Sequence, residues 1–248
     1  MKAWRIENDD GIDALNLTDV EIDDPGPGEV RVKMMTSSIN RRDMNTVLAP
    51  SARNTPLPRI PNSDGAGEVL AVGANVTEFK PGDRVASCFF KRWEAGRISA
   101  AVMASALGGA EEGMLSAETV LPGGALVHVP DHLTWDEAGT LTCAGVTAWH
   151  GLVARGGLKA GETVLLLGTG GVSIFGLQFA KMMGARTIIT SKSGEKLERA
   201  RDLGADETIN YAETPDWDKA VMDLTGGVGV DHVVEVGGAG TLQKSVGA

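Results

Sequence analysis

The chain has 248 residues, enough for one or two domains with a sizeable hydrophobic core. Its 33 acidic residues exceed its 23 Lys and Arg residues, and the net charge of −10 argues against nucleic-acid and anionic-membrane partners. Only two cysteines occur, and no apolar run approaches the roughly twenty residues of a membrane span. These features predict a soluble, cytoplasmic protein.

The first part of the chain, residues 1–130, predicts a compact β-rich domain. Short strand-like segments alternate with turns that contain Pro and Gly, as at 24–28 and 80–83. The stretch 92–113, rich in Ala, Gly and Ser, resembles a loop, and its composition assigns it no function. The expected strands are 2–6, 29–35, 67–72, 84–86, 118–121 and 126–129.

The remainder, residues 131–248, predicts an α/β domain. Thr134 and Glu137 have the spacing of a capping box, so a helix is expected to begin there and run towards residue 142. A second helical stretch is expected at 147–153. Alternating βαβ units then predict a doubly wound parallel sheet. The expected strands are 164–167, 187–190, 207–209 and 231–236, and the expected helices are 172–183, 195–203 and 218–224.

A strand, a glycine-rich turn and a helix follow one another at 164–183. Gly168 permits a tight turn, Gly170 lets the backbone approach a pyrophosphate, and the helix N-terminus offers free N–H groups. Ser173 stands where this fingerprint has Gly or Ala, and it is small enough for close packing. The alternative is an ordinary strand-to-helix turn, but the flanking strands and helix favour dinucleotide binding.

The end of the second strand of this domain predicts NADP(H) rather than NAD(H). An NAD site usually has an acidic residue there for the ribose 2′-OH, and residues 190–193 contain none. Ser191 and Lys192 instead supply a hydroxyl and a cation that suit a 2′-phosphate, although a solvated helix start with Ser193 as N-cap is an alternative. Tyr211 follows the third strand and either flanks the adenosine or packs on the surface. The expected cofactor contacts are Gly168, Thr169, Gly170, Gly171, Val172, Ser191, Lys192 and Tyr211.

The order of these features resembles the medium-chain dehydrogenase/reductase superfamily. The resemblance rests on residues 80–85, 144–148 and 168–172 and extends along essentially the whole chain. The chain is similar to the zinc-containing alcohol dehydrogenases and, more closely, to their zinc-free quinone oxidoreductase-like relatives. It implies a GroES-like catalytic domain at 1–130, a Rossmann domain at 131–248, and hydride transfer to or from a carbonyl, alcohol, quinone or activated alkene.

Departures from the zinc-containing branch concern its metal ligands. Asn40 replaces the first ligand, a Cys, and Ser63 replaces a His, so that only Cys143 matches a ligand position. The region of the family's structural zinc lobe, which needs four cysteines, offers Cys88 alone. A catalytic zinc needs three suitable protein ligands. No metal site is therefore expected, and Cys143 is interpreted as a packing residue.

Without zinc, another group must stabilise negative charge on the substrate oxygen. The side-chain amide of Asn40 is the expected donor. One of the arginines that follow, Arg41 or Arg42, either adds charge or pairs with a nearby aspartate. Thr147 matches a family residue that lies near the nicotinamide, and helix packing explains it equally well.

The chain ends at Ala248, soon after its fourth expected Rossmann strand. Chains of the family that this sequence resembles continue with further strands. We therefore expect an incomplete sheet that lacks the strands through which the family usually forms a homodimer. Two rival hypotheses stay open. One is a non-catalytic dinucleotide-binding module or fragment, and the other is a zinc-dependent alcohol dehydrogenase with atypical ligands.

Overall fold

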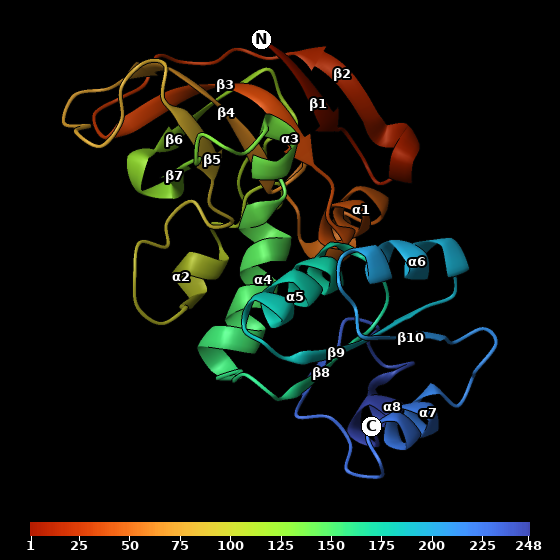
Figure 1. Cartoon of the computed structure of the whole chain (residues 1–248). Helices are drawn as coiled ribbons and strands as arrows, with labels where there is room; N and C mark the ends of the chain where they lie inside the picture. The colour runs from red at the N-terminus through yellow and green to blue at the C-terminus, as the bar shows by residue number, and fades with distance from the viewer. The chain divides into compact units, whose positions relative to one another are not determined.

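The computed structural model describes residues 1–248, which form two compact units, Met1–Cys143 and Ala144–Ala248. No helix in either unit combines the length and the apolar character that crossing a bilayer would require. The fold class is the expected α/β combination of a β-rich unit and a unit with a parallel sheet (Figure 1).

The first unit is built on a five-stranded antiparallel sheet in the order β6-β3-β4-β5-β7, accompanied by a separate β1-β2 hairpin (Figure 1). Its helices are short, and three of its turns are single-turn 3₁₀ segments. The strands are β1 (Lys2–Ile6), β2 (Leu15–Asp19), β3 (Glu29–Ser38), β4 (Asp64–Val72), β5 (Arg84–Ser87), β6 (Glu118–Pro122) and β7 (Leu126–His128). The helices are α1 (Arg41–Leu48), α2 (Ala100–Met103) and α3 (Trp135–Ala138), and the 3₁₀ segments are η1 (Gly11–Ala14), η2 (Ser51–Arg53) and η3 (Gly123–Ala125).

All six strands expected in this unit are confirmed. Alternate residues of β3, Val30 and Val32, are fully buried in the core of this sheet, as the period of a half-buried strand requires. β4 begins at Asp64, three residues earlier than expected, because Asp64 to Ala66 pair with the end of β3. The helix at the Thr134–Glu137 capping box is confirmed as α3, which ends at Ala138 instead of continuing towards 142.

The second unit contains a four-stranded parallel sheet in the order β10-β9-β8-β11. Along β8, Val164 and Leu166 pack among residues of α5 and α6, whereas Leu165 and Leu167 pack against α7. Helices thus cover both faces of the sheet, as a doubly wound fold requires (Figure 1). The strands are β8 (Thr163–Leu166), β9 (Arg186–Ser191), β10 (Glu207–Asn210) and β11 (His232–Val234). The helices are α4 (Val146–Trp149), α5 (Gly171–Met182), α6 (Gly194–Asp202), α7 (Trp217–Leu224) and α8 (Leu242–Val246), with the π-helical turn η5 (His150–Arg155); a further π-helical turn, η4 (Leu141–Gly145), runs from the end of the first unit into the second.

Candidate functional site

The glycine-rich turn after β8 has the conformation that the sequence predicts. Gly168 has a φ of +74°, which L-residues rarely adopt, and its N–H donates to the hydroxyl of Thr190 at 3.1 Å. A Cβ atom built on Gly168 or Gly170 would meet no heavy atom within 4 Å, so the outer face of the turn is open. No side chain caps the N-terminus of α5, which leaves its first N–H groups available to an anion.

Ser173 fits between α5 and the sheet as expected. The residue is fully buried, and its hydroxyl donates to the carbonyl oxygen of Leu167 at 2.7 Å. This hydrogen bond ties the first turn of α5 to the end of β8. Ser173 therefore does more than leave room for close packing, because it also fixes the turn that carries the open glycines.

At the end of β9, the three candidate residues have different surroundings. Ser191 is buried, and its hydroxyl lies 3.3 Å from the hydroxyl of Thr169 and accepts from the N–H of Ser193 at 3.3 Å. Ser193 is the N-cap of α6, as the alternative interpretation predicts, since its hydroxyl accepts from the N–H of Lys196. Lys192 is exposed and takes part in none of the ion pairs of this unit. Lys192 thus carries a positive charge that no ion pair of this unit neutralises.

Tyr211 follows β10 at the same ends of the strands. Its backbone N–H donates to the carbonyl oxygen of Ser191 at 3.1 Å, while its ring is 39% exposed. The parallel sheet therefore brings together the turn after β8, the residues after β9, and Tyr211. Val172 is half-buried in the first turn of α5.

In the first unit, Asn40 is the N-cap of α1, and its N–H donates to the carboxylate of Asp43 at 2.8 Å. Its side-chain Nδ2 atom is buried and has no hydrogen-bond partner. An unsatisfied buried donor costs about 1–3 kcal/mol, and such a group calls for an explanation. Asn40 therefore has a buried side-chain donor that no hydrogen bond within the chain uses.

A buried carboxyl group, that of Asp64, lies in the same region. It accepts from the hydroxyl of Ser63 at 2.7 Å and from the N–H of Cys143 at 3.0 Å. Burial, and to a lesser extent the charge of Asp43, raise the pKa of Asp64, whereas the hydroxyl of Ser63, the nearby side-chain amide of Asn40 and the N–H of Cys143 lower it by less than that. Sequence reasoning did not assign Asp64 a role of its own, because its burial depends on the pairing of β4 with β3.

The two arginines next to Asn40 differ. Arg42 is committed to structure, since its Nη1 donates to Asp43 at 2.9 Å and to the carbonyl oxygen of Leu107 at 2.6 Å, and its guanidinium lies over the ring of Phe89. Arg41 is exposed. The Leu107 contact gives the segment 92–113, which has no assigned function, one structural connection to α1.

The donor set at the family's zinc position does not fit a zinc ion. Burial, and then the charges of Asp64 and Asp43, raise the pKa of the Cys143 thiol to about 12, so this thiol is protonated at neutral pH in the chain by itself. The hydroxyl of Ser63 is occupied by Asp64, and an amide replaces the first ligand. Nowhere in the chain do three His, Cys, Asp or Glu side chains converge as a metal site would need.

Thr147, the second expected catalytic residue, lies on α4 in the second unit. It is exposed. Its exposure leaves the hydroxyl accessible, but no hydrogen bond of this side chain marks it as prepared for chemistry. A role near the nicotinamide stays a prediction from the resemblance.

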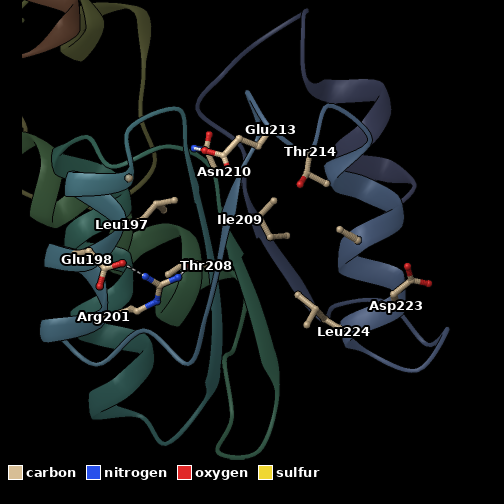
Figure 2. Close-up of a pocket in the computed structure, with 12 residues that line it drawn as sticks. Leu197, Glu198, Arg201, Thr208, Ile209, Asn210, Glu213, Thr214, Asp223 and Leu224 are labelled. Atoms are coloured by element: carbon tan, nitrogen blue, oxygen red, sulfur yellow. Dashed lines mark hydrogen bonds and ion pairs between the residues drawn. The ribbon is translucent and has the colours of Figure 1, made fainter.

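A groove of about 600 Å³ lies between α6 and α7 over the free edge of β10 (Figure 2). Leu197, Ile209 and Leu224 extend towards it from α6, β10 and α7, and Arg201 is paired with Glu198 and Thr208 on one side (Figure 2). None of the expected cofactor contacts lines this groove. It is therefore distinct from the candidate dinucleotide site.

Comparisons with known proteins match both units. Residues 26–131 match the family described as alcohol dehydrogenase GroES-like domain, and residues 171–248 match the family described as zinc-binding dehydrogenase. A zinc-type alcohol dehydrogenase-like protein of Schizosaccharomyces pombe is 45% identical over 239 residues, which are 95% of this chain and 69% of that protein. A quinone oxidoreductase of Pseudomonas aeruginosa is 34% identical over 239 residues, 95% of this chain and 66% of that protein.

Among solved structures, one described as an NAD-dependent alcohol dehydrogenase has a TM-score of 0.90 at 35% identity. The match covers 100% of this chain and 74% of that one. The chain thus spans about two thirds of the length of the two curated relatives and somewhat more of the solved chain.

Proposed function

Because the chain belongs to the medium-chain dehydrogenase/reductase superfamily, we propose that it transfers a hydride between NADP(H) and a carbonyl, alcohol, quinone or activated alkene, without zinc. The observation that carries this proposal is the open glycine turn after β8, joined to a helix whose first N–H groups are uncapped. Such a turn suits the pyrophosphate of a dinucleotide.

The chain's own residues fit the cofactor. Gly168, Thr169, Gly170, Gly171 and Val172 would hold the pyrophosphate against the start of α5. Lys192 would bind the 2′-phosphate with its free ammonium group, and Ser191 would support it from the end of β9. Tyr211 would flank the adenosine. When bound, the nicotinamide would supply or accept the hydride.

The choice of NADP(H) over NAD(H) rests on residues 190–193. These residues contain no carboxylate for a ribose 2′-OH and do contain an exposed cation. A structural neighbour is described as NAD-dependent, so kinship alone does not select the cofactor. The exposed ammonium of Lys192 is what supports NADP(H) in this chain.

For the substrate, we propose that Asn40 donates a hydrogen bond to an oxygen that gains negative charge. The free Nδ2 donor of Asn40 supports this role, and a single preorganised donor of this kind contributes about 2.7–4 kcal/mol to transition-state stabilisation. Because Nδ2 is buried, the amide has to turn to meet a substrate oxygen. The proposed zinc independence rests on the donor set of Asn40, Ser63 and Cys143.

The experiment that tests this function is a tryptophan-fluorescence titration of the chain with NADPH and, separately, with NADH. NADPH should bind tightly and NADH weakly. NADPH oxidation is then measured with a quinone, an activated alkene and an aldehyde. Turnover of any of these substrates supports the proposal, whereas tight NADPH binding without turnover favours the non-catalytic binding module. Binding of neither nucleotide contradicts the dinucleotide site.

A cytoplasmic location and a homodimer stay predictions. The first rests on cysteine usage, since Cys88 and Cys143 are both free thiols. The second is only what the family resemblance implies, and the strands that form this dimer in the family are not among residues 1–248.

A further inference from the structure

The turn that follows β11 lies next to the glycine turn that follows β8. β11 pairs with β8 in parallel, with Val234 opposite Leu166 at the carboxyl ends of the two strands. From β8, the sheet continues through β9 and β10 on one side and through β11 on the other. Ligands of open α/β sheets bind in the crevice outside the carboxyl ends where the strand order reverses. That point lies between β8 and β11.

One carboxylate, that of Glu235, holds the turn after β11 together. Its Oε1 accepts from the N–H groups of Gly237 at 2.7 Å and Gly238 at 2.8 Å, and from the hydroxyl of Thr241 at 2.8 Å. Its other oxygen, Oε2, accepts from the hydroxyl of Ser245 in α8. A Cβ atom on Gly237 would lie 2.3 Å from Oγ1 of Thr241, so the backbone of Gly237 lies too close to Thr241 for a larger residue.

The carboxylate is held in its charged form. Partial burial works to raise the pKa of Glu235, but the hydrogen bonds from Ser245, Thr241 and the two backbone N–H groups together lower it below its usual value. Hydrogen bonds to an ionised acceptor are stronger than those between neutral groups. Glu235 therefore fixes the backbone of residues 237–238 more firmly than a neutral side chain would.

The direction of the dinucleotide links this turn to function. If Lys192 after β9 binds the 2′-phosphate and the Gly168 turn binds the pyrophosphate, the nicotinamide half continues to the other side of β8. The residues after β11 lie on that side. The turn that Glu235 stabilises then forms the side of the crevice that contacts the nicotinamide half.

We propose that Glu235 is a positioning residue for the nicotinamide half of the dinucleotide, which it serves by fixing the backbone of Gly237 and Gly238 beside the Gly168 turn. This inference rests on the proposed function. It concerns a residue that does not touch the cofactor, because the carboxylate is occupied by its four internal donors.

The test compares NADPH with 2′,5′-ADP, which contains the adenosine half and the 2′-phosphate but no nicotinamide half. In Glu235→Ala, the dissociation constant for NADPH should rise about tenfold or more, because the hydrogen bonds to a charged acceptor that hold the turn are lost. The dissociation constant for 2′,5′-ADP should change less than about twofold. A loss of structure throughout the unit would weaken both ligands.

Two further variants serve as controls. Ser245→Ala removes the donor to Oε2 and the contact of the same hydroxyl with the carbonyl oxygen of Thr241, and it should leave NADPH binding nearly unchanged, since the three donors to Oε1 stay. Glu235→Gln keeps a carbonyl oxygen for the same three donors but loses the charge, so its NADPH affinity should lie between those of Glu235→Ala and the unaltered chain. If Glu235→Ala does not fold, Thr241→Val preserves shape but removes the hydroxyl that bonds both Oε1 of Glu235 and the carbonyl oxygen of Gly238, and it should weaken NADPH but not 2′,5′-ADP.

The outcomes separate this inference from the proposed function. Equal weakening of NADPH and 2′,5′-ADP in Glu235→Ala, or unchanged NADPH binding in Glu235→Ala or in Thr241→Val, overturns the positioning role. If the unaltered chain binds neither ligand, the dinucleotide function itself is wrong, and the inference falls with it. Selective weakening of NADPH supports both.

Discussion

Replacing Lys192 by alanine tests the cofactor choice at the residue that carries it. The Lys192 side chain is exposed, so its interaction with a 2′-phosphate has to be calculated with the dielectric constant of water. Two unit charges 4 Å apart then attract by about 1 kcal/mol. A phosphate with a charge of about −1.5 to −2 gives about 1.5–2 kcal/mol, which corresponds to a loss of roughly 10- to 30-fold in NADPH affinity.

The assay is a pair of fluorescence titrations at low ionic strength, one with NADPH and one with NADH. NADH has no 2′-phosphate, so Lys192→Ala should change its affinity by less than about twofold. Added salt should reduce the difference between Lys192→Ala and the unaltered chain, because the charges are exposed. Lys196→Ala, which replaces another exposed lysine, in the first turn of α6, is the matched control and should affect neither nucleotide. An equal loss for NADH and NADPH would refute the 2′-phosphate role.

Three further results are expected. Asn40→Ala should lower kcat by about 10²–10³-fold with NADPH affinity unchanged, and steady-state kinetics that show an unaltered kcat would remove Asn40 from the mechanism. Treatment with a chelator should leave turnover intact, and a loss that added zinc restores would contradict the zinc-free proposal. Folding raises the pKa of Asp64, so this group favours the folded state below the unfolded pKa of about 3.9, and that contribution is lost as the pH rises through the folded pKa. The free energy of unfolding of Asp64→Asn, measured by urea unfolding, should therefore fall less than that of the unaltered chain as the pH rises above about 4. An identical pH dependence in the two chains would show that Asp64 does not cause the loss of stability.

Much of the fold was predictable because the signals are local. The alternation of buried residues in β3, the continuous apolar run of β8 and the Thr134–Glu137 capping box depend only on neighbours in the sequence. The sequence reasoning did not identify α1 or β2. α1 is polar, with few apolar positions, and is held by Asp43 and by its contact with the η1 segment. β2 is only five residues long and is defined by its pairing with β1. Such elements depend on partners distant in the chain.

The candidate site shows the same division between local and distant causes. The tight turn at Gly168 follows from the backbone freedom of glycine, and the sequence predicts it. The hydrogen bonds of Glu235 come from residues up to ten positions away, in a turn whose shape the sequence does not define. A glutamate two residues before a pair of glycines, at the end of a strand, was the available signal, although the sequence reasoning did not use it.

Ser191 and Lys192 show why spacing identifies a position more readily than a function. Both lie at the distance from Gly168 where a dinucleotide-binding protein selects its cofactor, and the sequence therefore assigns both to the 2′-phosphate. The buried hydroxyl of Ser191, however, already has Thr169 and the N–H of Ser193 as partners, whereas the charge of Lys192 has none. A group that is already satisfied gains less from a ligand than one that is free. Selectivity between NADPH and NADH should thus depend mainly on Lys192, and Ser191 should contribute mainly by holding the Gly168 turn in place for either nucleotide.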